Sequence, residues 1–172
     1  RDLLGTRGQI IILVLPLLPV LAFYLLTPIA SPTPGIDVYY FQLQAAQALL
    51  TGWNPYEFTF VNIYGSGTEL YPTGDAVSYP YPPMSFVFAL VGHLLGDVRW
   101  SLITCHLAAA GLLCATARQR GLPTAETIVF GGLFLYLPYG PFVSEQAWTD
   151  PTVTLSLGLM SLFLARRQPT AA

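Results

Sequence analysis

Residues 9–27 read QIIILVLPLLPVLAFYLLT, and this long apolar run decides the fold class. About 20 apolar residues in a helix cross the roughly 30 Å hydrocarbon core of a bilayer. The composition of the whole chain agrees, because 53% of its 172 residues are hydrophobic and only 9% are charged. A soluble domain carries many more charges. We therefore predict an all-α integral membrane protein.

Four further apolar runs follow, at residues 84–95, 100–117, 125–142 and 153–165. Apolar runs with short polar connections are typical of a polytopic bundle of transmembrane helices, which is the fold that we predict. The chain starts at Arg1 instead of Met and ends soon after its last run. We interpret residues 1–172 as the N-terminal part of one transmembrane domain in a longer protein. The first run is expected to remain as an uncleaved anchor, because residues 28–32 make a poor signal-peptidase site.

Residues 28–83 form a polar outer loop between the first two apolar runs. This loop contains no Lys or Arg and carries four acids, Asp37, Glu57, Glu69 and Asp75. Lys and Arg concentrate on the cytoplasmic side of membrane proteins, so the loop is expected outside, and Arg1 and Arg7 place the N-terminus in the cytoplasm. The net charge of −2 argues against nucleic-acid binding.

Two topologies are open for the remaining runs. If every run crosses the membrane, the Arg118 and Arg120 pair lies outside and the loop with Glu145 and Asp150 lies inside, against the positive-inside rule. If the run at 84–95 does not cross, the arginine pairs lie inside and that loop faces outward beside Asp37. A helix over this short run is only about 18 Å long, which favours the second topology.

Residues 37–51 predict an amphipathic helix within the outer loop. Its polar stripe recurs every three or four residues and consists of Asp37, Tyr40, Gln44, Gln47 and Thr51. Its apolar side consists of Val38, Phe41, Ala45, Ala48 and Leu49. Gly52 is expected to end this helix, and Asn54-Pro55 to force an extended turn. We predict that the helix lies along the membrane surface and places the Asp37 carboxylate at the mouth of a groove.

Two roles are open for Asp37. An Asp at a helix start satisfies an unpaired amide and complements the helix dipole, so Asp37 could be an N-cap. A carboxylate in a groove at the membrane edge could equally act as a general base. The two roles are compatible with each other.

Several other side chains also have both a structural and a functional interpretation. The tyrosines of the outer loop fit an aromatic belt at the membrane interface, while Tyr40 and Tyr81 are candidates for contact with a substrate. His93 and His106 fall inside apolar runs, where a His is either functional or a packing group that forms a hydrogen bond. Gly131-Gly132 indicates close helix packing rather than a nucleotide-binding loop.

The order of several short motifs resembles the glycosyltransferase-C superfamily. The motifs are Asp37-Val38-Tyr39-Tyr40, Ala45-Ala46, Leu49-Leu50, Gly52, Asn54-Pro55-Tyr56 and, before the next apolar run, Tyr79-Pro80-Tyr81-Pro82-Pro83. Within the superfamily, the chain is most similar to the bacterial polyprenyl-phosphate-mannose-dependent mannosyltransferases. The resemblance covers residues 9–167. In the later loop, relatives often read Gly-Gln-x-Asn, whereas this chain reads Ser144-Glu145-Gln146-Ala147-Trp148.

The resemblance implies a membrane glycosyltransferase of the bacterial cell membrane, active on its outer face. Such an enzyme transfers a sugar, here expected to be mannose, with inversion from a polyprenyl-phosphate donor to a glycan or glycolipid acceptor. Asp37 would be the catalytic base. The expected substrate-binding residues are Tyr40, Gln44, Asn54, Tyr56, Tyr81, Glu145 and Gln146. Residues 1–172 alone are expected to be inactive, because later spans close the groove in this family.

A departing phosphate also needs a positive partner, for which Arg is the best-suited side chain. The outer loop contains none, so we expect the cation in a later part of the protein. Glu145 and Asp150 could hold a divalent metal as hard oxygen ligands, although two acids in a loop are more often solvated surface. No metal or other cofactor is assigned.

Two other classes of protein remain open. A transporter or flippase segment would use Asp37 to bind or gate a cation. A non-catalytic membrane subunit would use the outer loop as an interaction surface. Acids deep inside the spans would favour the transporter, but the apolar runs hold only Glu126, which follows Thr124 near the start of its run and fits helix capping.

Overall fold

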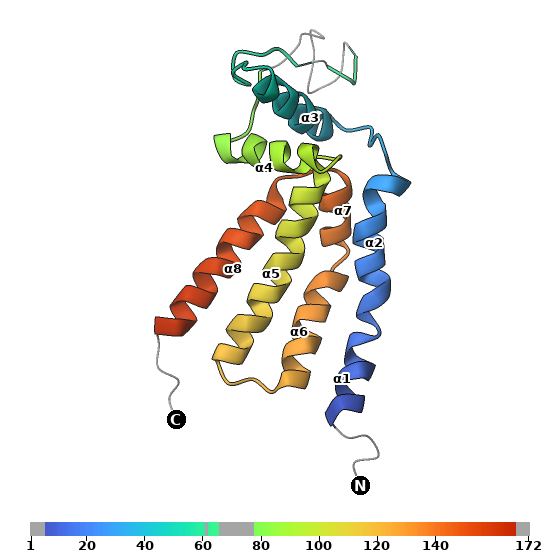
Figure 1. The fold of residues 1–172 in the computed structure, drawn as a ribbon, viewed down its shortest axis with the longest axis vertical. Coiled ribbons are helices and arrows are strands. Elements are labelled where there is room, and N and C mark those ends of the chain that lie inside the picture. Colours follow the sequence, from blue (N-terminus) through green and yellow to red (C-terminus); the bar gives the residue numbers. More distant parts are fainter. Residues whose placement is uncertain (1–5, 61, 66–77, 168–172) are drawn as a thin grey trace.

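A computed structural model describes residues 6–60, 62–65 and 78–167 (Figure 1). Each regular element within these ranges is a helix, as the sequence predicted. The helices are α1 (Thr6–Val14), α2 (Leu17–Ala30), α3 (Asp37–Leu50), α4 (Pro83–Leu94), α5 (Arg99–Gln119), α6 (Thr124–Tyr136), α7 (Tyr139–Glu145) and α8 (Asp150–Arg167). Glu69 and Asp75 lie outside the described residues.

Two of these segments are long and apolar enough to cross a membrane. Ile10–Ala30, which joins α1 and α2, has 21 residues and a mean hydropathy of 2.7, and α5 also has 21 residues and a mean hydropathy of 1.5. Pro16 separates α1 from α2, as expected of a residue without an amide proton. The α6 and α7 helices make a third candidate span if the pair is taken together. The chain thus has two or three candidate membrane-spanning helices.

The apolar run at 125–142 is not the single helix that the sequence predicted. It breaks between α6 and α7, whose axes differ by 51°. Leu137 is extended at the break, with φ −60° and ψ 123°, as expected of a residue before proline. Pro138 follows and cannot donate an amide hydrogen bond to the preceding turn.

The long helices run side by side along the longest axis of the molecule, and α3 and α4 lie across one end (Figure 1). We call this the α3 end. It also carries the connection between α7 and α8. The opposite end carries Arg118 in the last turn of α5 and Arg166 and Arg167 in the last turn of α8. α4 lies across this end and does not run along the bundle (Figure 1).

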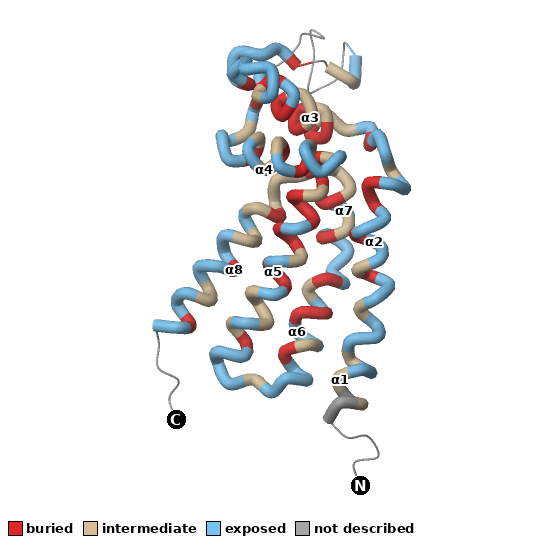
Figure 2. The backbone as a smooth tube through the Cα atoms, viewed as in Figure 1, coloured by how far each residue is buried: buried red, intermediate tan, exposed pale blue. Residues whose placement is uncertain are grey.

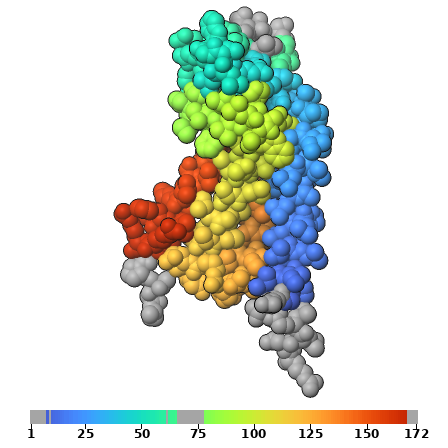
Figure 3. All heavy atoms as spheres, in the orientation of Figure 1, coloured from blue at the N-terminus to red at the C-terminus, as the bar shows by residue number. Residues whose placement is uncertain are grey.

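The amphipathic helix was predicted well, but its packing was not. The apolar residues Val38, Phe41, Ala45 and Ala48 are buried, whereas Gln47 and Thr51 are exposed. Gly52 ends the helix with a φ of +82°, a backbone conformation that glycine adopts without strain. The buried face packs on α4 and on Phe60 and Tyr79 of the outer loop. In Figure 3 the atoms of α3 lie on α4, which lies on the end of α5.

Buried residues concentrate where α3, α4 and the upper parts of α5 and α7 meet (Figure 2). The outer faces of the long helices instead expose large apolar side chains, such as Phe23, Leu133 and Leu157. Gly131 faces Cys114 of α5 so closely that a Cβ atom would clash, and Gly132 faces Leu17. The predicted role of Gly131-Gly132 in close helix packing is confirmed.

Arg99 ties these elements together at the α3 end. Its side chain is fully buried, and its guanidinium makes an ion pair with Asp97 at 2.7 Å, with a second bond from Nε to Asp97 at 2.9 Å. The remaining bonds go to backbone carbonyls of Ser31 at 2.7 Å, Pro28 at 3.3 Å and Glu145 at 3.4 Å. A guanidinium has five N–H donors, so this set uses all of them. Arg99 thereby joins the C-terminal ends of α2 and α7 to the start of α5.

Replacing Arg99 should therefore destabilise the whole α3 end. We expect Arg99→Met to lower the free energy of unfolding by about 3 to 5 kcal/mol, because it leaves Asp97 and three carbonyls without their partner. Thermal unfolding in detergent micelles measures the effect. Arg118→Gln is the control, because Arg118 is exposed and bonds only the Leu122 carbonyl among the contacts described. Equal stability of the two variants would contradict this role for Arg99.

Candidate active site at the α3 end

Asp37 is the first residue of α3 and is half-buried. Its Oδ1 accepts the amide of Val38 at 2.8 Å and the hydroxyl of Tyr64 at 3.4 Å. The Tyr64 hydroxyl in turn accepts the Asp37 amide at 3.1 Å. The cap position itself belongs to Ile36, so the predicted N-cap role was wrong by one residue. Asp37 still satisfies an amide of the first turn, and these contacts fix the direction of its carboxylate.

Tyr81 connects Asp37 to a second acid. The pKa of the Tyr81 hydroxyl is raised to about 12, first by burial and then by the negative charges of Asp37 and Asp150 and by Tyr64. Both carboxylates are therefore close enough to act on one phenol. Asp150 lies in the first turn of α8 and accepts the hydroxyl of Tyr139 at 3.0 Å. We call Asp37, Asp150, Tyr64, Tyr81 and Tyr139 the two-acid site.

The pKa of Tyr81 offers a direct test of this geometry. Asp37→Asn should lower that pKa below about 12, because it removes one of the negative charges that oppose the tyrosinate form. NMR of the chain with ¹³C-labelled tyrosine measures the titration, and Tyr81→Phe assigns the signal. Glu57→Gln is the control, because Glu57 is not among the charges that act on Tyr81. An unchanged midpoint in Asp37→Asn would show that the two side chains are not neighbours.

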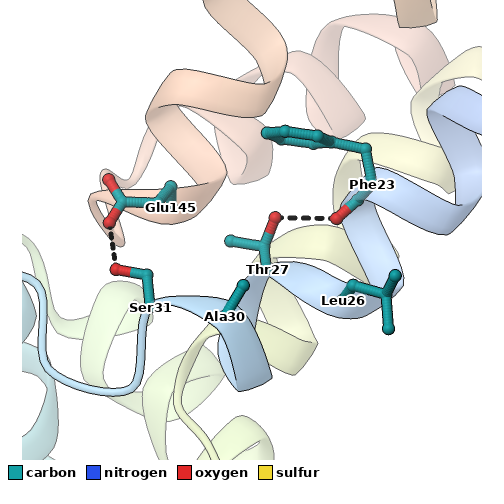
Figure 4. A pocket seen from close by; sticks show the side chains of 6 residues that line it. All are labelled: Phe23, Leu26, Thr27, Ala30, Ser31 and Glu145. Atoms are coloured by element: carbon teal, nitrogen blue, oxygen red, sulfur yellow. Dashed lines mark hydrogen bonds between the residues drawn. The ribbon is translucent and has the colours of Figure 1, made fainter.

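Glu145 lies at the end of α7 and does not join Asp150. Its carboxylate accepts the Ser31 hydroxyl at 2.5 Å (Figure 4). It also accepts the side-chain amide of Gln146. Asp150 is held instead by Tyr139. Among the described residues, no three acidic, His or Cys side chains form a group that could hold a metal ion. The suggestion that Glu145 and Asp150 share a metal therefore has no support in this geometry.

An apolar groove of about 340 Å³ runs along α2 and ends at Glu145. Figure 4 shows Phe23, Leu26, Thr27 and Ala30 from α2 leading to the hydrogen bond between Ser31 and Glu145. Thr27 contributes little polarity, because its hydroxyl donates to the Phe23 carbonyl at 2.8 Å. The groove thus has hydrocarbon walls and one polar end, which lies at the α3 end.

The other predicted substrate-binding residues lie on α3 and in the turn that follows it. Asn54 forms the expected turn, because its side chain accepts the Tyr56 amide and donates to Glu57, each at 3.1 Å. Tyr56 donates its hydroxyl to the backbone carbonyl of Tyr81 at 2.7 Å and so helps to hold the backbone of Tyr81 in place. Tyr40 and Gln44 lie on the predicted stripe of α3 and are half-buried.

Sequence reasoning missed three residues that the structure brings into this end: Arg99, Tyr64 and Tyr139. Arg99 could have been noticed, since a charged residue at the edge of an apolar run needs a partner, and Asp97 stands two residues before it. The tyrosines carry no comparable signal. Their role depends on contacts with residues 27 and 11 positions away.

Comparison with family models, curated proteins and solved structures finds no match to this chain. The resemblance to the glycosyltransferase-C superfamily stays a prediction from the motifs.

Proposed function

We propose that this chain belongs to a membrane glycosyltransferase that uses a polyprenyl-phosphate sugar, with Asp37 as the general base. The observation that carries the proposal is the two-acid site. A half-buried carboxylate, oriented by the Val38 amide and the Tyr64 hydroxyl, lies at the end of a bundle of apolar helices, and its charge and that of Asp150 both act on the Tyr81 hydroxyl. A lipid-linked substrate places its reacting group at such a boundary between apolar and polar surroundings.

The proposed step is a single displacement with inversion. The acceptor hydroxyl loses its proton to the Asp37 carboxylate while its oxygen bonds to the anomeric carbon of the sugar. The bond from that carbon to the phosphate oxygen breaks at the same time, and the lipid phosphate leaves with the electron pair. General-base catalysis of this kind requires the base within hydrogen-bond reach of the hydroxyl. The Oδ1 atom of Asp37 accepts the Val38 amide, which orients the carboxylate for taking the proton.

The leaving phosphate needs a cation, and Arg99 does not supply one. Arg99 is the only arginine or lysine at the α3 end among the described residues, and its five N–H donors already have partners. The phosphate partner is therefore expected outside these residues. Tyrosine hydroxyls of the two-acid site add donors but no positive charge.

The groove along α2 suits the hydrocarbon part of a lipid substrate. Its walls are apolar, and its polar end meets Glu145 at the same end of the molecule as Asp37. A carboxylate repels a phosphate but accepts hydrogen bonds from sugar hydroxyls. We therefore assign Glu145 to a hydroxyl-bearing headgroup and not to the donor phosphate.

We further propose that the α3 end faces outward from a bacterial cell membrane, with the N-terminus in the cytoplasm. The support is the charge pattern, because the pairs at Arg118 and Arg120 and at Arg166 and Arg167 lie at the opposite end.

Cysteine labelling tests this orientation. Ser144 is fully buried and unsuitable for labelling, whereas Thr59 and Gln119 are exposed and lie toward opposite ends. In a background with Cys105→Ala and Cys114→Ala, Thr59→Cys should react with an impermeant maleimide on intact cells. Gln119→Cys should react only after the membrane is opened. The reverse result would place the two-acid site on the cytoplasmic face.

The base is tested in the full-length protein. Asp37→Asn should reduce transfer from a radiolabelled polyprenyl-phosphate mannose to below detection, because an amide cannot accept the proton. Glu57→Gln is a matched control, since it also removes an acid from the outer loop and should leave transfer unchanged. Membrane insertion and thermal stability are measured for both variants. Normal transfer by Asp37→Asn would remove that residue from the mechanism.

A transporter remains the second candidate, because a broken helix beside a buried histidine occurs in transporter folds. The break between α6 and α7 and the nearby His106 provide this feature. Uptake of a labelled substrate into vesicles, without any transfer to an acceptor, would favour this alternative.

A further inference from the structure

The break between α6 and α7 lies against His106 of α5, deep in the bundle. His106 follows Arg99 by seven residues, which places it roughly 10 Å along the helix from the α3 end. Its ring stacks on Phe134 of α6 with centroids 4.7 Å apart and lies 5.2 Å from the ring of Tyr24 in α2. Gly140 faces the ring, and a Cβ atom there would lie 2.6 Å from Nε2. Three helices and the break therefore enclose one imidazole.

The Nε2 atom of His106 has no hydrogen-bond partner in the structure, although only 5% of the residue is exposed. A buried polar atom without a partner costs about 1 to 3 kcal/mol. In native proteins such atoms are nearly always satisfied by protein or by ordered water. The Phe134 ring stacks on the imidazole, the Tyr24 ring is tilted by 31° against it, and neither residue hydrogen-bonds Nε2.

A cavity of about 70 Å³ begins at this imidazole. His106, Phe134 and Gly140 line its inner part, and Tyr139, Asp150 and Thr154 contribute to the same cavity. Tyr139 and Asp150 hydrogen-bond each other and belong to the two-acid site. A cavity needs only about 10 to 15 Å³ to hold one water molecule, provided that it offers two to four polar partners. This cavity meets both conditions, whereas apolar cavities of similar size stay empty.

We propose that this cavity is a hydrated site, in which ordered water binds the Nε2 of His106 and continues to the Tyr139 and Asp150 pair. The ligand is water or the hydroxyl group of a small alcohol, because the cavity is too small for a sugar and has an imidazole nitrogen without a partner on its lining. The site joins Asp150 to the interior of the bundle through hydrogen bonds. The inference concerns hydration and stands independently of the transfer reaction.

The test uses the complete protein in lipid nanodiscs with ¹⁵N- and ¹³C-labelled histidine. NMR measures magnetisation transfer from water protons to the His106 ring, and His106→Phe assigns the signal. His93 in α4 is only half-buried and serves as an internal reference for a ring near water. We expect transfer to both rings. Transfer to His93 without transfer to His106 would overturn the proposal.

Two variants in α8 distinguish the loss of water from the cavity from a general loosening of helix packing. Thr154→Leu adds an apolar side chain to the cavity wall and should abolish the transfer to His106. Ser156→Leu is the matched control, because Ser156 is exposed and lies outside the cavity. Both hydroxyls make the same bond to the carbonyl four residues before, at 2.9 Å. Transfer that persists in Thr154→Leu, or that disappears equally in both folded variants, would contradict the assignment of water to this cavity.

Discussion

The arrangement of the α3 end depends on the burial of one positive charge. Arg99 can be buried only because Asp97 neutralises it and because backbone carbonyls of α2 and α7 accept its other protons. Helix C-terminal ends carry partial negative charge, so two of them pointing at a guanidinium add to the attraction. The Tyr39 ring covers it from α3, 5.2 Å away. This set of contacts fixes four helices relative to one another, and the two-acid site is built on that frame.

The bonds that bury Arg99 also explain why the two-acid site has, among the described residues, no cation for the leaving phosphate of the proposed reaction. A buried guanidinium whose N–H donors all have partners stabilises the fold. It cannot also bind a phosphate without losing those hydrogen bonds. Asp37 and Asp150 come from segments more than 100 positions apart in the chain, yet both act on Tyr81. The structure thus gathers acids and hydroxyls at one end and keeps the other described arginines at the opposite end.

Local patterns in the sequence predicted the helices and much of the burial. The three-and-four spacing identified α3 and its apolar face, and Gly52 marked its end. Contacts between distant residues could not be predicted in this way. Gln42 is 99% buried and accepts the Tyr79 hydroxyl at 2.9 Å, a partner 37 residues away. Asp37 could be named from motifs, but the effect of both Asp37 and Asp150 on Tyr81 depends on the tertiary arrangement and could not be predicted.

The break at Leu137 and Pro138 divides one apolar run into two helices that are held by different contacts. On one side, α6 is held against α5 and α2 by Gly131 and Gly132. On the other side, α7 is fastened separately through Glu145, which bonds both Ser31 and Arg99. Because the two halves share no continuous backbone hydrogen-bond ladder, strain applied to one is not transmitted rigidly to the other. The position of α7 is therefore set by the contacts of Glu145 with Ser31 and Arg99 and not by a continuation of α6.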